Sequence, residues 1–181
     1  MILGSHLSIA GGVHNALIAA SDLGFRAAAL FVRNQRRWDA KPLTDTDVET
    51  FRTTREQTGT QAVVAHGSYL INLAGQPEVR DKSIVALADE LDRCARLGIE
   101  QYVMHPGSHA DAATGMAMIA DALNAAVAKP GPRILLETTA GAGNTLGATF
   151  EQLAELLAML TPAEQVGACL NWPTVRVNLD S

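Results

Sequence analysis

The sequence contains only two cysteines in 181 residues, Cys94 and Cys169. Cys94 falls in a helical pattern and Cys169 in an apolar run, so the pair predicts neither a disulfide framework nor a paired-cysteine metal site. No basic leader precedes a longer apolar run after Met1, which argues against a secretory signal. No apolar stretch approaches the ~20 residues that span a bilayer. These absences favour a soluble protein in the reducing cytoplasm, with no membrane partner.

Positive charge is also scarce, because 14 lysines and arginines face 19 aspartates and glutamates, for a formal net charge of -5. Nucleic-acid-binding proteins usually carry a basic face, so any such face here must be local. Arg33, Arg36 and Arg37 form the only tight basic cluster in the sequence. The hydrophobic share of 48% is sufficient for one sizeable core, and no linker divides the chain. A single domain over residues 1–181 is therefore expected.

Short β-prone runs alternate with longer helical patterns, which is typical of repeated βα units around a parallel sheet. The expected strands are Ile2–His6, Ala27–Val32, Ala62–His66, Gln101–His105, Arg133–Thr138 and Val166–Leu170. The expected helices are Val13–Leu23, Asp45–Gln57, Glu78–Leu97, Ala113–Ala128 and Phe150–Leu160. Gly24 and Gly98 are placed to end helices, and Thr44 to cap one.

The length of the repeat indicates the fold class. Each unit takes about 30 residues, close to the repeat of an eightfold TIM barrel, which needs around 250 residues in total. The sequence therefore predicts an α/β fold of the (β/α) TIM-barrel type that is incomplete, with about six of eight βα units. From Asn171 onward the helical period is absent, so residues 171–181 are expected to form an atypical tail.

Three successive expected strands end in a side chain that can bind a metal ion: His66, His105 and Glu137. The C-terminal ends of parallel strands open on one face, so these side chains are expected to converge. Two imidazoles and a carboxylate suit zinc or a similar divalent ion, and they leave coordination positions for water and substrate. One histidine at a strand end is often only a hydrogen-bonded structural residue, but three ligands in register favour a catalytic metal site.

Two further histidines flank these residues. His6 ends the first expected strand, where it could form hydrogen bonds to a metal ligand instead of binding the metal itself. His109 has the i, i+4 spacing of a helical zinc pair with His105, but Pro106-Gly107 between them makes a helix implausible there. We therefore expect His109 to orient its neighbours or to contact phosphate.

The loop after the second expected strand, Phe31–Trp38, combines cations, amides and an indole. Such a mixture, with Asn34 and Arg36 at its centre, can grip phosphates and wedge into a base stack. A solvated loop with a packed indole explains the composition equally well. Tyr69, just past the third expected strand, is likewise either a wedge at the same face or an ordinary packing residue.

A glycine-rich loop, Gly141–Gly147, follows one expected strand and precedes a helix. Its spacing misses the dinucleotide-binding pattern G-x-G-x-x-G by one residue, and no acidic residue completes a ribose site. A turn whose amides can contact phosphate fits better, so no nucleotide cofactor is expected.

Taken in order and at their separations, five motifs resemble endonuclease IV, a zinc-dependent TIM-barrel family that cuts DNA at abasic sites. The resemblance covers about residues 1–170, and its motifs are highly specific. They are Gly4-Ser5-His6-Leu7-Ser8 with Gly11-Gly12, Asn34-Gln35-Arg36, His66-Gly67-Ser68-Tyr69-Leu70-Ile71-Asn72-Leu73, His105-Pro106-Gly107-Ser108-His109, and Glu137-Thr138-Thr139-Ala140-Gly141.

This resemblance implies a trinuclear zinc site that hydrolyses the phosphodiester 5′ to an abasic deoxyribose and leaves a 3′-hydroxyl. His66 and His105 would hold one zinc ion, and Glu137, the catalytic residue, would bridge it to the second.

The resemblance also implies a partner, double-stranded DNA with abasic sites. Arg36 and Tyr69 match the side chains that enter the duplex and hold the gap left by the flipped nucleotide. Asn34, His6 and His109 are assigned with them to the DNA-binding surface.

The sequence departs from the family after the sixth expected strand. The family continues Asp-Thr-Cys-His, which supplies ligands to the second and third zinc ions, whereas this chain has Asn171-Trp172-Pro173-Thr174. A neutral asparagine cannot supply the bridging charge, and threonine is a poor zinc ligand. At most one of the three zinc ions is therefore expected here, with little or no nuclease activity. The oligomeric state is left undefined.

Two other functions remain open. A sugar isomerase or epimerase of the xylose-isomerase-like barrels also has histidine and glutamate ligands at strand ends, although Arg36 and Tyr69 argue against a small sugar substrate. A non-catalytic DNA-binding fragment is the other possibility, and salt-dependent binding without cleavage would identify it.

Overall fold

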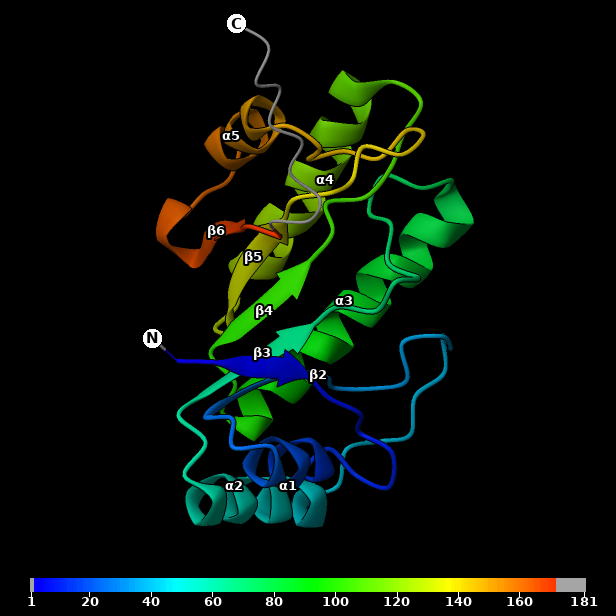
Figure 1. The fold of residues 1–181 in the computed structure, drawn as a ribbon. Helices are drawn as coiled ribbons and strands as arrows, with labels where there is room; N and C mark the ends of the chain where they lie inside the picture. Colours follow the sequence, from blue (N-terminus) through cyan, green and yellow to red (C-terminus); the bar gives the residue numbers. More distant parts are fainter. Residues whose placement is uncertain (1, 172–181) are drawn as a thin grey trace, which may run out of the picture.

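The structure is a computed structural model that describes residues 2–171. Strands and helices alternate along this part of the chain (Figure 1). The strands are β1 (Gly4–His6), β2 (Ala27–Phe31), β3 (Ala62–His66), β4 (Gln101–Met104), β5 (Arg133–Glu137) and β6 (Val166–Cys169). The helices are α1 (Asn15–Asp22), α2 (Asp45–Thr58), α3 (Pro77–Leu97), α4 (Ala112–Val127) and α5 (Phe150–Ala158), with a 3-10 turn, η1 (Ala163–Gln165), before β6.

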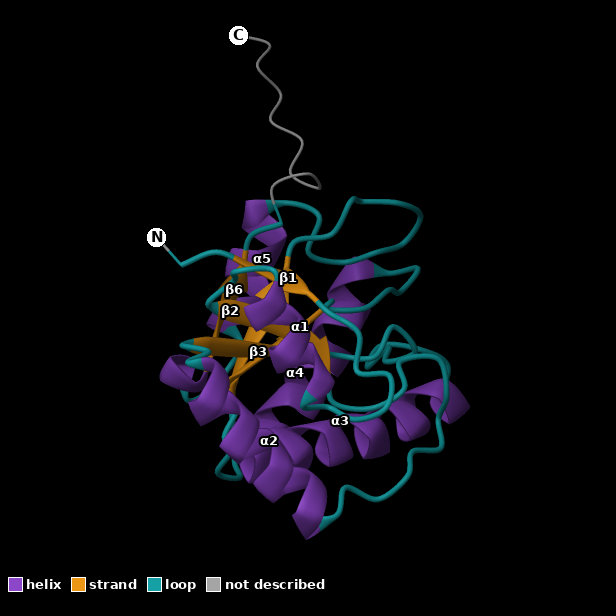
Figure 2. Ribbon diagram, turned by 60° about the horizontal axis from the view of Figure 1, so that its bottom comes forward, coloured by secondary structure: helices purple, strands orange, loops and turns teal. Residues whose placement is uncertain are grey.

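The six strands form one parallel sheet in sequence order, from β1 to β6. Helices cover one side of this sheet, with α1 and α2 packed together at one end and α5 beside β6 at the other (Figure 1). Viewed from another direction, helices surround the sheet on the outside, and long loops gather at one end of the strands (Figure 2). This topology confirms the expected TIM-barrel type of α/β fold. Over the described residues the sheet stays open, with β1 and β6 at its edges.

The hydrophobic core lies between the sheet and the helices. Alternate strand residues such as Leu30, Ala65 and Leu136 are fully buried, as are helix residues such as Leu17 and Ile119. All of them belong to one continuous apolar cluster. The opposite set of strand residues is therefore left for the inner face, where the expected metal ligands lie.

Local signals in the sequence explain where the helices begin and end. At α2, Thr44 accepts a hydrogen bond from the backbone of Asp47, and the Asp47 side chain accepts one from the backbone of Thr44, which forms a capping box. Gly98 ends α3 in a left-handed conformation, with φ at 73°, that side chains with a Cβ disfavour. The ends of the observed strands and helices differ from the expected ones by no more than two residues.

None of the described helices is long and apolar enough to cross a membrane. The expected tail, residues 171–181, falls outside the described part except for Asn171.

Candidate metal centre and its surrounding loops

The strand register brings the three expected metal ligands to one place. In the pairing of β4 with β5, His105 and Glu137 follow at the same level, because the residues just before them are partners. In the pairing of β3 with β4, His66 lies opposite Val103, two residues before His105. Since side chains alternate along a strand, all three ligands share the inner face of the sheet. The parallel arrangement predicted from the sequence is therefore what assembles the cluster.

The cluster is tight. Glu137 Oε2 lies 3.0 Å from His66 Nε2 and 3.6 Å from His105 Nε2. One ligand atom from each of the three residues lies within 4.8 Å of the others. Glu137 is buried, with 8% exposure, while the side chains of His66 and His105 are 13% and 40% exposed. The site is therefore enclosed on the sheet side and open toward solvent past His105.

Hydrogen bonds define the protonation of His66. Its Nδ1 lies 2.8 Å from the carbonyl oxygen of Gly67, which can only accept, and its Nε2 faces the Glu137 carboxylate. Burial lowers the pKa of His66, but the hydrogen bonds to Glu137 and Gly67 outweigh burial, and the net pKa is raised. The hydrogen bond from His66 is also the main cause that lowers the pKa of Glu137. Without metal, a proton thus joins the two residues.

The pKa values of His105 and His6 are both lowered, which favours the neutral form of these two imidazoles. Burial lowers the pKa of His105, and the neighbouring His66 lowers it further. The pKa of His6 is lowered for the same two reasons, burial first. A neutral imidazole has a lone pair available for a metal ion.

These residues fit a divalent metal ion. The bond from Nδ1 of His66 to Gly67 orients its Nε2 toward the cluster, as such second hydrogen bonds do in known metal sites. A cation placed between the two Nε2 atoms and Oε2 would replace the proton that His66 shares with Glu137. Two imidazoles and a carboxylate match the ligand preferences of zinc. His66, His105 and Glu137 are therefore the residues that could hold it.

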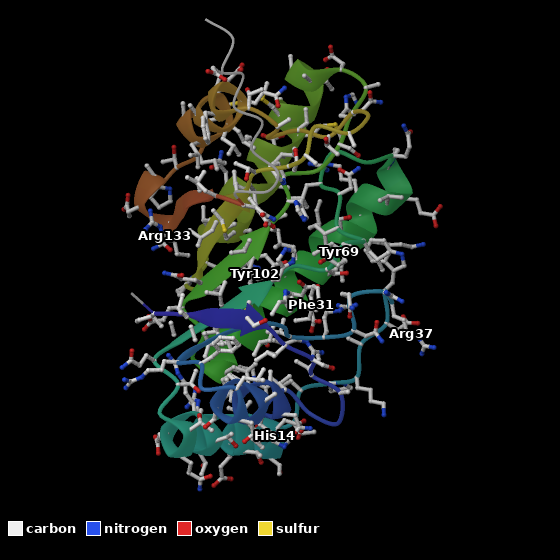
Figure 3. All side chains as sticks on the ribbon, viewed as in Figure 1. His14, Phe31, Arg37, Tyr69, Tyr102 and Arg133 are labelled. Atoms are coloured by element: carbon white, nitrogen blue, oxygen red, sulfur yellow. The ribbon has the colours of Figure 1, made fainter. Side chains whose placement is uncertain are left out.

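Aromatic rings surround this cluster. The Tyr69 ring is stacked near His105, with centroids 6.1 Å apart and planes inclined by 29°. It also lies 5.4 Å from His66 and 5.5 Å from Phe31. Tyr69 is nevertheless 61% exposed, and it lies with Phe31 on the same side of the strands (Figure 3). One face of this ring is therefore free to meet a ligand at the mouth of the site.

The expected DNA-binding residues of the β2–α2 loop lie beside this mouth. Asn34 and Arg36 are both exposed. The Asn34 side chain accepts a hydrogen bond of 2.9 Å from the Arg36 backbone, so it shapes the turn that presents Arg36. Arg37 extends from the same loop on the outer side of the molecule (Figure 3). Arg33, counted in the sequence with this basic cluster, is instead buried.

The two flanking histidines have different positions. His6 joins the aromatic group, with its ring 4.5 Å from Phe31 and 5.7 Å from His66. His109 lies apart from the cluster at the start of α4, where its Nδ1 is 3.0 Å from the Asp111 backbone nitrogen. These local bonds shape the turn, and His109 is not part of the group formed by His66, His105 and Glu137.

The glycine-rich loop uses several of its amides internally. The backbone of Leu146 donates to Gly107, and the backbone amides of Gly147 and Ala148 both donate to the Gln152 side chain at 3.1 Å. The bond to Gly107 holds the loop against the turn after β4, and the bonds to Gln152 hold it against α5. The amides of Leu146, Gly147 and Ala148 are therefore not free to contact a phosphate, in contrast to the expectation for this turn.

Three residues that matter to the site were not singled out as such from the sequence. Phe31 lies between His6, His66 and Tyr69, and its place as the last residue of β2 was the available signal. Asn171 donates a hydrogen bond of 2.9 Å to Glu137 Oε1, although the sequence suggested only that it lacks charge. Glu90, on α3, is fully buried behind the turn that follows His66.

The fold and the ligand arrangement define a class that sequence comparison also finds. Residues 17–174 match the family described as xylose isomerase-like TIM barrel. The chain belongs to this family.

Within this family, the similar proteins at about 40% identity are named endonuclease 4 or endonuclease IV. The chain is 43% identical over 174 residues to a protein of Chloroflexus aurantiacus named probable endonuclease 4, covering 93% of this chain and 61% of that protein. It is 42% identical to a protein of Geobacter sulfurreducens with the same name, covering 93% and 59%. The crystal structure of endonuclease IV from Thermus thermophilus superposes with a TM-score of 0.82 at 40% identity, covering 94% and 62%. The resemblance to endonuclease IV is thereby confirmed, and the chain spans about three-fifths of the length of these relatives.

The sugar epimerases share the fold. The structure of a D-psicose 3-epimerase superposes with a TM-score of 0.79 but only 16% identity, covering 100% of this chain and 67% of that one. Such a likeness reflects the common barrel architecture and gives no indication of a sugar substrate.

Proposed function

We propose that this chain carries the metal-binding and DNA-binding part of an endonuclease IV-type enzyme, which hydrolyses the phosphodiester 5′ to an abasic site in double-stranded DNA. The observation that carries the proposal is the convergence of His66, His105 and Glu137, with ligand atoms within 4.8 Å, beside the exposed Tyr69 ring. A metal centre alone would fit many hydrolases. The relatives named probable endonuclease 4 support DNA as the substrate among the many that such hydrolases act on.

Zinc is the proposed ion, and it would lie between His66, His105 and Glu137. When bound, it would supply Lewis acidity toward a phosphoryl oxygen and toward water. The chain's own residues prepare this site: Gly67 orients His66, and Glu137 supplies the negative charge that holds a cation. The open side past His105 admits a phosphate group.

DNA recognition is proposed for the two loops beside the metal centre. Arg36 is exposed on the β2–α2 loop, and Tyr69 is exposed on the turn after β3. A cation and an aromatic ring at the rim of a metal site suit a phosphate backbone and an opened base stack. Asn34 would act through Arg36 by shaping its turn, and His6 and His109 would border the DNA.

Hydrolysis by this chain alone is proposed to be slow. Among residues 2–171, His66, His105 and Glu137 are the one group of three ligands that could hold an ion. The second carboxylate oxygen of Glu137 accepts a hydrogen bond from Asn171 and is therefore less available to a further ion. A single ion neutralises less of the charge that develops on phosphorus oxygens than several would.

Metal analysis and a DNA assay test the proposal together. Purified protein is expected to contain about one zinc per chain. It should bind a duplex with an abasic site more tightly than an undamaged duplex, and any cleavage should leave a 3′-hydroxyl. His66→Ala should remove the zinc and the cleavage. Folded wild-type protein that binds zinc but shows neither a preference for abasic DNA nor cleavage would contradict the proposed function.

A further inference from the structure

A buried polar network lies directly behind the metal centre, between β4, α3 and two loops. Its centre is Glu90 on α3, which is 0% exposed. Glu90 Oε2 accepts hydrogen bonds from the Tyr102 hydroxyl at 2.7 Å and from the Ser68 backbone nitrogen at 3.1 Å. A buried carboxylate is costly unless it is paired, so the presence of Glu90 on the buried side of α3 calls for an explanation.

The partner of Glu90 on the DNA-facing side is Arg33. Its guanidinium Nη2 donates to the backbone carbonyls of Arg37 and Trp38, and its Nη1 donates to Asp89 at 2.9 Å. These bonds close the β2–α2 loop around Arg33. Although it belongs to the basic cluster of the sequence, Arg33 is only 7% exposed and therefore has little surface to offer DNA.

Arg33 and Glu90 face each other at 3.9 Å, between Nε and Oε1. Neither of these two buried atoms has a hydrogen-bond partner among the described residues. Their attraction is therefore electrostatic and acts in a poorly hydrated interior, where it is stronger than at the surface. Burial raises the pKa of Glu90, while Tyr102, Ser68 and Arg33 oppose that effect.

The network joins the two loops that the proposed function assigns to DNA. On one side, Arg33 holds the loop that carries Arg36. On the other, Glu90 holds the backbone of Ser68, which directly precedes Tyr69. The Ser68 hydroxyl closes the connection by donating to the Gln35 carbonyl at 2.9 Å.

The packing around this connection leaves little freedom. A Cβ added at Gly67 would lie 2.6 Å from the Tyr102 hydroxyl, which is itself held by Glu90. The turn after β3 is therefore pressed against the network, and His66 begins this turn. A movement of Glu90 would be transmitted to Tyr69 by direct contacts.

We propose that the Arg33–Glu90 pair is a positioning element that sets the Arg36 loop against the Tyr69 turn, so that both side chains meet the DNA duplex in one geometry. This role rests on the proposed DNA function of the two loops. Within the described chain, Arg33 and Glu90 form no hydrogen bond or ion pair with His66, His105 or Glu137, although the charge of Glu90 is a minor cause that raises the pKa of His66. Their proposed effect on DNA binding acts through Arg36 and Tyr69.

The decisive variant is Glu90→Gln. The glutamine oxygen can still accept hydrogen bonds from Ser68 and Tyr102. The amide NH2 group, however, replaces the carboxylate oxygen that faces Arg33, so the attraction between the two side chains is lost. The matched control is Glu78→Gln on the same helix, which removes an exposed ion pair with Lys82. Ser68→Ala provides a second, milder variant, because it removes the hydroxyl bonds to the Gln35 carbonyl and from the Leu70 backbone but keeps the backbone bond to Glu90.

The readout is a double-mutant cycle on binding to a duplex that contains a tetrahydrofuran abasic-site analogue, measured by fluorescence anisotropy. Arg36→Ala should weaken binding by about tenfold in the wild-type background but less than about twofold in the Glu90→Gln background, since residues that act as a unit are not additive. Cobalt(II) affinity should change by less than about twofold in Glu90→Gln, because the three metal ligands remain in place. Glu78→Gln should leave both quantities unchanged.

Additive losses from Arg36→Ala and Glu90→Gln would overturn the inference, and so would a loss of cobalt affinity parallel to the loss of DNA affinity. If the wild-type protein binds cobalt but no duplex, the proposed DNA function is wrong, whereas the positioning role of Arg33 and Glu90 is still open to test. The positioning role is then decided by amide hydrogen exchange in Ser68→Ala and Glu90→Gln. Faster exchange confined to residues 34–38 and 67–70 supports it, whereas unchanged or global exchange refutes it.

Discussion

At the scale of single residues, the candidate metal centre depends on the proton that lies between His66 and Glu137. One ring nitrogen of His66 faces the Gly67 carbonyl and the other faces the Glu137 carboxylate, so His66 and Glu137 share a proton when no metal is bound. A divalent ion competes with this proton, and its binding is expected to release one. The same contacts that raise the pKa of His66 therefore mark the position of the ion.

Glu137→Gln tests the carboxylate. The amide keeps the shape but removes the negative charge that attracts a cation, so cobalt affinity should fall by at least about tenfold. Titration of the cobalt absorption spectrum measures this, with the exposed Glu100→Gln as control. Retention of wild-type affinity in Glu137→Gln would place the ion elsewhere.

Asn171→Asp tests the residue that departs from the endonuclease IV pattern. The asparagine amide donates to Glu137 Oε1, whereas an aspartate would place a second carboxylate there. Two neighbouring carboxylates favour cations, so cobalt affinity should rise several-fold or a second equivalent should bind. Calorimetric titration gives the stoichiometry. An Asn171→Ala control that behaves like Asn171→Asp would show that loss of the hydrogen bond, and not the new charge, is responsible.

At the scale of the elements, helix ends and strand ends contribute to different properties of the protein. Helix ends carry local stability, as the capping box of α2 shows, while strand ends carry the candidate ligands. A change at a cap should therefore alter stability without altering metal affinity.

Thr44→Ala should lower the free energy of unfolding by about 1 kcal/mol. The hydrogen bonds from Thr44, side chain first and then backbone, also lower the pKa of Asp47. A carboxyl group with a lowered pKa adds stability above its unfolded pKa, and this contribution is lost as the pH falls through the folded pKa. Urea unfolding at neutral and acid pH should thus show a smaller difference between wild type and Thr44→Ala in acid. If the free energies of unfolding of wild type and Thr44→Ala differ equally at both pH values, the titration of Asp47 does not contribute to the effect of the cap.

The regular elements and the convergence of His66, His105 and Glu137 could be predicted from the sequence, because their signals are local. Strand runs such as Ala62–His66 show apolar character, and each ligand follows such a run directly. Glu90 could not be assigned in the same way, since its partners Arg33, Ser68 and Tyr102 lie far away in the sequence. A signal did exist: Glu90 occupies the buried stripe of α3 between Leu87 and Cys94, where a charged residue is unexpected.

Asn34 and His109 show another limit of prediction from sequence. Motif resemblance assigned both to DNA, but it could not reveal that Asn34 shapes the Arg36 turn or that His109 shapes the start of α4. Such short-range bonds depend on backbone angles that motif letters do not specify.

At the scale of the whole molecule, the metal centre joins three adjacent strands, β3, β4 and β5. Ligands that bind only the folded state stabilise it by mass action. The ion should therefore act on global stability, and not only on its immediate surroundings.

Cobalt at about 100 times its Kd should stabilise the folded chain by about 2.7 kcal/mol and raise the unfolding midpoint by roughly 5–10 °C. EDTA should reverse the increase, and His66→Ala should abolish it. Differential scanning calorimetry is the measurement. A rise of equal size in His66→Ala would mean that the metal binds at another site.

The register of β3, β4 and β5 has a further consequence for how the chain refolds. A slip of one residue between β3 and β4 would turn His66 to the helix-covered side and leave the ion with two ligands. The cobalt absorption band of the complete site can therefore develop only in molecules whose three strands are correctly aligned. In a stopped-flow refolding experiment, the time course of this band would report strand alignment separately from the far-ultraviolet signal of helix formation.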